Sequence, residues 1–332
     1  MIRRWLLPLG SVAAALALLT VGLALAGYDA PAALAAMARG AVGSPYAFFS
    51  QTLLRATPLI LIGLAVSFAF RSGALNIGAE GQFYAGAIAA TWAGVHAGQL
   101  PPLVAVSWVL IAGCSAGLLW SAVPAWLRLR FGVLEVISTL LLNFVAESLV
   151  SWMVTGPMQE ARRAYPQSDP IAASAHLPLL TGRLHLGFVI ALLLAVVLWA
   201  FFARTRLGFE FRAAGAGPRA AETVAKIPVT RRLAQALLVS GTIAGLAGAV
   251  EVSGVSYALF QNLSPGYGFT GIAVALLARL DPRGVIASGI LFAALEAGAA
   301  GMQRDAGVPS VVVYVVEAVV IIAILLAGKA RR

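Results

Sequence analysis

Two stripes of polar residues lie within an otherwise apolar sequence, and their side chains are the ones best suited to bind a solute. Both stripes repeat at intervals of four residues, which places each set along one face of a helix. Carboxylate, amide and hydroxyl groups of this kind hydrogen-bond a neutral solute rich in OH and NH groups, such as a sugar or a nucleoside. The first stripe consists of Ser72, Asn76, Glu80 and Tyr84, and the second of Glu135, Thr139, Asn143, Glu147 and Ser151.

Six members of these stripes are candidate solute-pathway residues. A charged side chain at mid-membrane costs on the order of 3 kcal/mol, so intramembrane carboxylates face a bundle interior or a water-filled cavity. The alternative is that the same groups only form hydrogen bonds between helices and hold the bundle together. The candidates are Asn76, Glu80, Tyr84, Thr139, Asn143 and Glu147.

The sequence shows no constellation of catalytic or metal-binding residues. The three histidines, His96, His176 and His185, are scattered and lack metal-ligand spacing. The chain contains no H-E-x-x-H motif and no G-x-x-x-x-G-K-[ST] loop, so it lacks the usual zinc and nucleotide signatures. We therefore expect that this chain is not an enzyme and holds no cofactor. If its activity consumes ATP, the ATP is hydrolysed on another subunit.

The composition is that of an integral membrane protein. Of the 332 residues, 61% are hydrophobic and 11% are charged, and the mean hydropathy is +0.92. A soluble domain carries roughly 25% charged residues. Apolar runs of about 20 residues are long enough to span a bilayer as helices, whereas the period-two alternation of a membrane barrel is missing. We predict an all-α, polytopic membrane protein that forms one membrane domain over residues 1–332.

Ten apolar segments predict about ten transmembrane helices, an even number that places both termini on the same side of the membrane. Arg3, Arg4 and Ala24-Leu25-Ala26 around the first segment also resemble a secretory signal. Its apolar run of about 22 residues exceeds the usual length, which favours an uncleaved span; cleavage would leave nine spans. The segments are 5–27, 52–70, 73–95, 102–123, 133–155, 186–203, 233–253, 267–280, 284–303 and 309–328.

The distribution of positive charge predicts that both termini are cytoplasmic. In this orientation the inner segments hold 17 of the 23 lysines and arginines, and the outer segments hold six, in agreement with the positive-inside rule. The net charge of +10 is then a topology signal that faces anionic membrane lipid, and it does not indicate binding to nucleic acid. Two polar stretches become an outer loop over residues 156–185 and a cytoplasmic loop over residues 204–232.

The cytoplasmic loop contains a short amphipathic helix, predicted over residues 218–227. Gly217 precedes Pro218, which suits the first turn of a helix, and Pro228 stops it. The helix either lies on lipid headgroups or enters a groove on a cytoplasmic partner. Its apolar face is small and lacks an aromatic anchor, so it would bind a membrane weakly. Docking on a cytoplasmic partner is therefore favoured. That face carries Ala220, Ala221, Val224 and Ile227, and its flanks carry Arg219, Glu222 and Lys226.

Glycines four residues apart predict close contacts between helices. Gly113 and Gly117 form one such pair, and Gly241 and Gly245 form another. Small residues at this spacing let membrane helices approach closely. We interpret both pairs as packing surfaces rather than as parts of a binding site.

Four segments resemble the permease subunits of bacterial ABC importers of the simple-sugar and nucleoside type, a group that includes ribose-type and branched-chain amino acid permeases. The segments cover most of residues 60–300 in the order that the family shows. They are RSGALNIGAEGQ at 71–82, GVLEVISTLLLN at 132–143, TRLGFEFRAAGAGPRAAETVAKIPV at 205–229 and GFTGIAVALLARLDPRG at 268–284.

The resemblance implies a division of labour among several subunits in the bacterial cytoplasmic (inner) membrane. This chain would form half of a pathway with a second permease, homologous or identical to it. Two cytoplasmic ABC ATPases would drive transport, and an extracytoplasmic solute-binding protein would deliver the solute. The short helix at 218–227, which follows Gly217, would be the coupling helix that docks on the ATPase. Lys226 stands in it where the family often has glycine. In this family the segment at 132–143 and the long outer loop favour nucleosides over ribose-like sugars as the transported solute.

Two other classes of protein compete with this interpretation. A proton-coupled secondary transporter could use the intramembrane carboxylates as proton carriers, and its uptake would stop when the proton gradient collapses. ATP-driven uptake survives that collapse when ATP is maintained. A membrane-embedded enzyme or a non-transporting scaffold is the third class, and no catalytic constellation supports it.

Overall fold

The computed structural model describes residue 17, residues 19–309 and residue 311. The last predicted span and most of the first fall outside the described residues. The chain forms two compact units. The first unit contains Thr181–Leu184 with the described parts of Met1–Ala56 and Ser288–Arg332, and the second contains Thr57–Leu180 and His185–Ala287.

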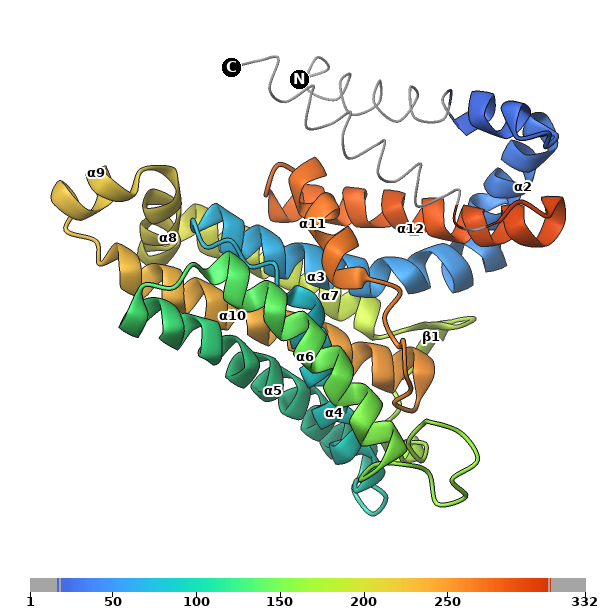
Figure 1. Ribbon diagram of the computed structural model, residues 1–332, viewed down its shortest axis with the longest axis horizontal. Helices are drawn as coiled ribbons and strands as arrows, with labels where there is room; N and C mark the ends of the chain where they lie inside the picture. Colours follow the sequence, from blue (N-terminus) through green and yellow to red (C-terminus); the bar gives the residue numbers. More distant parts are fainter. Residues whose placement is uncertain (1–16, 18, 310, 312–332) are drawn as a thin grey trace. The chain divides into compact units, whose positions relative to one another are not determined.

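Helices make up most of the described chain, and a long non-helical loop follows α6 (Figure 1). Two short strands, β1 (Leu179–Thr181) and β2 (Leu184–His185), pair with each other. The helices are α2 (Ala30–Val42), η2 (Ala47–Thr52), α3 (Leu53–Arg71), α4 (Ala79–Val95), α5 (Pro102–Phe131), α6 (Glu135–Thr155), η3 (Ala173–Ala175), α7 (Gly187–Arg204), α8 (Arg206–Ala216), α9 (Pro218–Thr223), α10 (Val229–Glu251), η4 (Val252–Ser256), α11 (Tyr267–Leu277) and α12 (Pro282–Ala306).

Six stretches of helix in the described chain are long and apolar enough to cross a membrane, which confirms an all-α, multi-pass membrane protein. Four of them, α5, α6, α7 and α12, are single helices, and the other two join η2 to α3 and α10 to η4. The six stretches are Ala47–Arg71, Pro102–Phe131, Glu135–Thr155, Gly187–Arg204, Val229–Ser256 and Pro282–Ala306.

The third predicted span begins later than the sequence indicated. The prediction started the helix at residue 73, but α4 begins at Ala79. The chain leaves α3 at Gly73, whose φ of +88° lies in the left-handed region that favours glycine. The Asn76 side chain then accepts a hydrogen bond from the Gly78 N–H at 2.9 Å. Local bonds of this kind compete with the helix, so residues 72–78 form a non-helical connector between α3 and α4.

Other helices also differ from the prediction. α5 continues past residue 123 to Phe131, and it ends where Gly132 takes a φ of +68°, the usual left-handed helix end. The helix α2 lies between the first two predicted spans, and α8 lies in the predicted cytoplasmic loop over residues 204–232. Each begins at a side-chain cap, Asp29 for α2 and Thr205 for α8, and such caps satisfy backbone N–H groups that a helix start leaves free.

Glycines bring α4, α5 and α10 into close contact at the centre of the second unit. A Cβ atom on Gly117 would lie 2.2 Å from the Gly241 carbonyl oxygen, and one on Gly245 would lie 2.2 Å from that of Gly113. Gly86 of α4 would meet the Gly245 carbonyl at 2.3 Å. These contacts confirm both predicted glycine pairs as packing surfaces. Residues 113–117 also match the G-x-S-x-G pattern, but they lie inside α5 and not at the strand-to-helix turn that a nucleophile needs.

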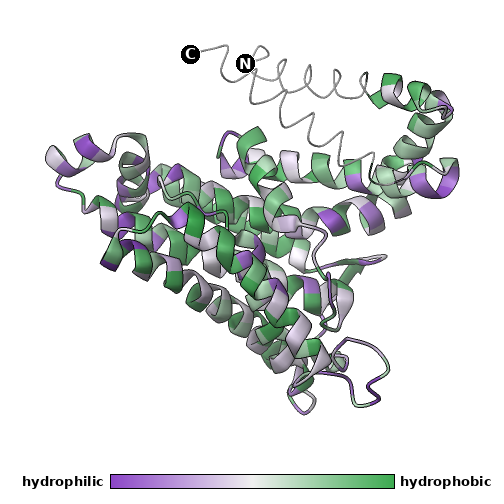
Figure 2. Ribbon diagram, in the orientation of Figure 1, coloured by the Kyte–Doolittle hydropathy of each residue, from purple (hydrophilic) through white to green (hydrophobic). Residues whose placement is uncertain are grey.

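The outward faces of α5 and α6 are apolar (Figure 2). On α5, Leu103, Leu119 and Trp126 each expose more than half of their surface. On α6, Phe144 and Trp152 do the same. Exposed apolar side chains along helices of spanning length suit lipid or a neighbouring membrane subunit.

The first unit is held together by α2 and the C-terminal part of α12. A Cβ atom on Gly40 would lie 2.9 Å from the Gly301 Cα atom, so the two backbones touch. Gly298 approaches Met37 in the same way. The Thr52 hydroxyl of η2 donates a 2.7 Å hydrogen bond to the Ala41 carbonyl at the end of α2.

Candidate functional site

Asn76, from the first polar stripe, holds three elements of the second unit together. Its Nδ2 donates to the Gln82 Oε1 at 2.8 Å and to the Ser240 Oγ of α10 at 2.9 Å. The Ser240 hydroxyl in turn donates to the Ala65 carbonyl of α3 at 2.7 Å. Asn76 is fully buried, and a buried amide is stable only with its hydrogen bonds satisfied. Asn76 therefore fixes the 72–78 connector against α3 and α10.

Asn143 and Thr139, from the second stripe, hold the other side of the connector. The Asn143 Oδ1 accepts from the Gly81 N–H at 2.8 Å, and its Nδ2 donates to the Ile77 carbonyl at 2.9 Å. The Thr139 hydroxyl accepts from the Ile77 N–H at 3.3 Å and donates to the Glu135 carbonyl at 2.6 Å. The two predicted stripes thus face each other across the start of α4.

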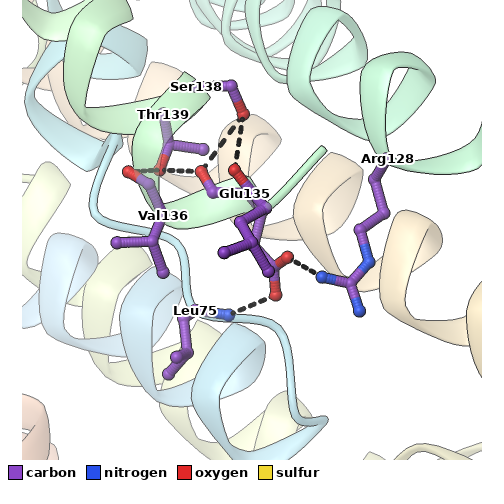
Figure 3. Close-up of polar contacts among 7 residues, drawn as sticks. Leu75, Arg128, Glu135, Val136, Ser138 and Thr139 are labelled. Carbon is purple, nitrogen blue, oxygen red and sulfur yellow. Dashed lines mark hydrogen bonds and ion pairs between the residues drawn. The ribbon is translucent and has the colours of Figure 1, made fainter. Parts of the chain in front are cut away.

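Glu135 and Arg128 form an ion pair beside the same connector (Figure 3). The Glu135 carboxylate also accepts from the Leu75 N–H at 3.3 Å. Only 6% of the Glu135 side chain and 25% of the Arg128 side chain are exposed. Sequence analysis missed Arg128 as a partner, because the two residues meet only when α5 turns into α6 at Gly132.

Glu80 contacts the first turn of α11, and Tyr84 contacts the stretch between η4 and α11. The Glu80 carboxylate accepts a short hydrogen bond from the Gly268 N–H, and Glu80 is buried. The Tyr84 hydroxyl lies 3.5 Å from the Ser264 carbonyl oxygen, which is at the outer limit of a hydrogen bond. This stretch was not among the predicted site residues, since it carries no helical periodicity.

A polar cavity of about 220 Å³ brings Tyr84 and Glu147 together. α4 contributes Tyr84, α6 contributes Glu147 and Ser151, and the turn after η4 contributes Gln261 and Asn262; Val150 completes the lining. The Gln261 Nε2 donates to the Ser151 Oγ at 2.7 Å and closes one side. Of the six predicted pathway residues, only Tyr84 and Glu147 line this cavity.

A further cavity lies in the first unit and has a different chemistry. Its volume is about 160 Å³, and Arg39, Arg304, Tyr46 and Gln51 are among its lining residues. Arg55 donates to the Gln51 side chain at 2.8 Å and adds a third guanidinium nearby. Arginines favour an anion over a neutral polar solute, so the cavity lined by Tyr84 and Glu147 is the better candidate for a neutral solute.

The short helix of the 204–232 loop ends earlier than predicted. α9 stops at Thr223, whereas the prediction continued to residue 227. The chain leaves the helix through Lys226, whose left-handed φ of +53° is incompatible with a continued helix, and the Ile227 N–H donates to the Ala221 carbonyl at 3.0 Å. The predicted apolar face is only partly buried. Ala221 and Ile227 are buried, whereas Ala220 and Val224 are exposed, Val224 by 82%.

An ion pair attaches this loop to the membrane helices. Glu210 of α8 accepts from the Arg232 Nε of α10 at 3.0 Å and from the Arg206 Nε at 3.2 Å. The hydrogen bond from Arg232 lowers the pKa of Glu210 below its usual value of 4.5. Glu210 is therefore a carboxylate at neutral pH and ties α8 to α10.

The variant Glu210→Gln is expected to melt about 2 °C lower than the unaltered chain at neutral pH, as fits an ion pair near the surface whose Arg232 and Glu210 side chains are 16% and 12% exposed. Because the folded pKa lies below 4.5, this contribution is complete above that pH and is lost as the pH falls through the folded pKa. Thermal melts between pH 3.5 and 8 in detergent measure the difference. Arg206→Gln, at a partner that is 92% exposed, is the matched control and should leave the melting temperature unchanged.

The apolar spanning helices, the buried polar stripes and the polar cavity define a membrane transport protein. Residues 48–325 match the family described as "Branched-chain amino acid transport system / permease component", and the chain belongs to this family. It is therefore a permease subunit of an ABC transporter and a multi-pass protein of the cytoplasmic membrane.

Three relatives resemble nearly the whole chain. A guanosine ABC transporter permease of Bacillus subtilis is 37% identical over 96% of this chain and 92% of its own length. A glucose ABC transporter permease of Haloferax volcanii is 36% identical over 98% of this chain and 88% of its own length. A nucleoside ABC transporter permease of Lactococcus lactis is 34% identical over 82% of this chain and 77% of its own length.

Proposed function

We propose that this chain is the permease of an ATP-driven importer that moves a nucleoside or a related simple sugar across the cytoplasmic membrane. The cavity lined by Tyr84, Glu147, Gln261 and Asn262 is the observation that carries the proposal, because its carboxylate, phenol and amides suit a neutral solute with many hydroxyl groups. Two of the relatives above are named for nucleoside cargo and one for glucose, which supports this solute class.

The proposed importer has several subunits. This chain pairs with a second permease, two cytoplasmic ATPases hydrolyse the ATP, and a solute-binding protein delivers cargo; this chain itself holds no cofactor. Membership of an ABC permease family supports the need for other subunits. The proposed topology has ten spans with both termini in the cytoplasm. Six stretches long enough to span a membrane lie in the described part of the chain.

The proposed pathway runs along the polar stripes. Glu147 and Tyr84 contact the cargo, and Asn76, Glu80, Thr139 and Asn143 form the wall that holds the connector in place. The hydrogen bonds of Asn76 and Asn143 support this division of roles, because their amides already bond within the chain. Contacts to cargo are weak and multiple, because tight binding would trap the cargo.

The proposed coupling of ATP to transport passes through the 204–232 loop. ATP closes the ATPase dimer, which moves Gly217 and α9, and the cavity then alternates between the two sides of the membrane. The surface of α9 and of Val224 directly after it supports this role, because Arg219, Ala220 and Val224 are exposed in the described chain. The Glu210–Arg232 ion pair offers a mechanical link from α8 to α10.

Val224→Glu is expected to lower ATP-dependent uptake about tenfold, because it places a charge in the apolar contact with the ATPase. Its effect on the melting temperature should be small, since Val224 is 82% exposed. Initial uptake rates in proteoliposomes give the readout. Ala216→Glu, at an exposed position at the end of α8, is the control. Equal uptake by the Val224 variant and the unaltered chain would contradict the proposed docking.

The proposed function is tested by reconstituting this chain with the permease, ATPase and binding-protein subunits encoded beside it. Uptake of labelled guanosine, adenosine, ribose and glucose is measured with and without ATP, in the presence of a proton ionophore. The importer predicts uptake that needs ATP and survives the ionophore. Uptake that ignores ATP and stops with the ionophore would show a proton-coupled transporter instead.

A further inference from the structure

The cavity lined by Tyr84 and Glu147 contains a carboxylate that the fold leaves free. Glu147 is exposed on α6, and among the described residues no group donates a hydrogen bond to it. The buried amides of Asn76 and Asn143, by contrast, bond to their neighbours on both atoms. A carboxylate on a spanning helix needs a polar environment, so Glu147 faces the solute pathway and not lipid.

The size of the cavity limits what it can enclose. Its volume of about 220 Å³ is below the roughly 300 to 1,000 Å³ of sites that enclose a drug-sized ligand. One ring of a nucleoside therefore fits inside the cavity, and the rest of the molecule extends beyond it.

The lining selects the hydroxyl-bearing ring. A carboxylate has only acceptor atoms, and its two oxygens can accept from two neighbouring hydroxyl groups. The side chain of Asn262 adds donors and an acceptor, and its φ of +58° is one that asparagine tolerates. Gln261 is oriented by its 2.7 Å bond to Ser151. Val150 and the Tyr84 ring supply an apolar wall for the carbon face of a sugar.

We propose that this cavity is a subsite for the sugar ring of the cargo, in which the Glu147 carboxylate accepts hydrogen bonds from two adjacent ring hydroxyls. The inference rests on the proposed function and adds a specificity to it: the permease itself, and not only a binding protein, distinguishes a diol-bearing ring from one without the diol. Gln261 and Asn262 are further members of the subsite.

The test compares a ribonucleoside with its 2′,3′-dideoxy analogue, which lacks the diol. Maximal uptake rates of both are measured in proteoliposomes for the unaltered chain, Glu147→Gln and Asn262→Ala, with the same binding protein throughout. Because the binding protein is constant, a change in the ratio of the two rates reports on the permease. Ser148→Ala is the matched control, since Ser148 is exposed beside Glu147 and bonds only to the Phe144 carbonyl of its own helix.

We expect Glu147→Gln to lower the ribonucleoside rate about tenfold, as for the loss of hydrogen bonds to a charged group, and to leave the dideoxy rate unchanged. An unchanged ratio in both cavity variants would overturn the subsite while the importer stands. Failure of the unaltered chain to take up any nucleoside or sugar would overturn the proposed function as well.

A second measurement covers the case in which the Glu147 variant fails to fold. The chain has one cysteine, Cys114, so Asn262→Cys in a Cys114→Ala background gives a single labelling site in the cavity. A saturating ribonucleoside should slow its reaction with a thiol reagent several-fold, and the dideoxy analogue should not. Equal protection by both, or by neither, would overturn the proposal.

Discussion

Gly245→Leu is expected to prevent the chain from accumulating in folded form in the membrane. A Cβ atom at this position would lie 2.2 Å from the Gly113 carbonyl oxygen and 2.8 Å from the Gly117 Cα atom. Both obstacles are backbone atoms, which cannot move aside like a flexible side chain, so α5 and α10 must separate. Overpacking of this kind costs about 3 kcal/mol, and membrane helices depend on such close packing for their association.

The measurement is size-exclusion chromatography of a fluorescent fusion in mild detergent, together with its melting temperature. Gly98→Leu is the matched control, because a Cβ atom on Gly98 meets nothing within 4 Å. The control should give the same peak as the unaltered chain. A normal peak and melting temperature for the Gly245 variant would show that α5 and α10 do not pack through these glycines.

Glu135→Ala is expected to destabilise the chain by about 3 kcal/mol and to abolish uptake. The substitution leaves Arg128, which is only 25% exposed, without its carboxylate. It also removes the acceptor of the Leu75 N–H, which holds the connector at the start of α4. Because the pair is largely buried, the loss should persist in high salt, where exposed ion pairs are screened.

Two further variants separate the charge of Glu135 from its role as an acceptor. Glu135→Gln keeps an oxygen for the Leu75 N–H but removes the charge, so it should lose less stability than the alanine variant. Arg128→Met combined with Glu135→Leu replaces the pair by apolar side chains and should recover part of the stability. Melting temperatures in detergent give the comparison. Equal stability of the alanine variant and the unaltered chain would disprove the role of this pair.

Several features of the protein follow from the sequence because they depend on neighbouring residues only. Apolar length predicts the spanning helices, and six of them are present in the described part. Glycine spacing predicts close contact, and the pairs at 113 and 117 and at 241 and 245 do meet. Helical periodicity places Glu80 on α4 and Asn143 on α6, as observed. The motifs around these residues predict the permease family, which the family match confirms.

Side-chain periodicity gave wrong helix bounds where the backbone conformation of a nearby residue breaks the helix. The polar stripe at 72–84 has helical spacing, but Gly73 and the Asn76 side chain break the helix before Ala79. The spacing of Val224 and Ile227 predicts a helix that continues to residue 227, but α9 ends at Thr223 and the backbone takes a left-handed φ at Lys226. In both cases a backbone constraint outweighs the periodicity of the side chains.

The sequence by itself determined that this protein is helical, spans the membrane and carries polar groups at the depth of the bilayer. Only the tertiary structure decided which of those groups are already bonded and which are free. Asn76 finds its partner Ser240 at a distance of 164 residues along the chain, and Gln261 reaches Ser151 across 110 residues. Hydropathy and periodicity describe one segment at a time, whereas the hydrogen bonds that distinguish a buried, fully bonded amide from a carboxylate without a hydrogen-bond donor in the described chain form between segments.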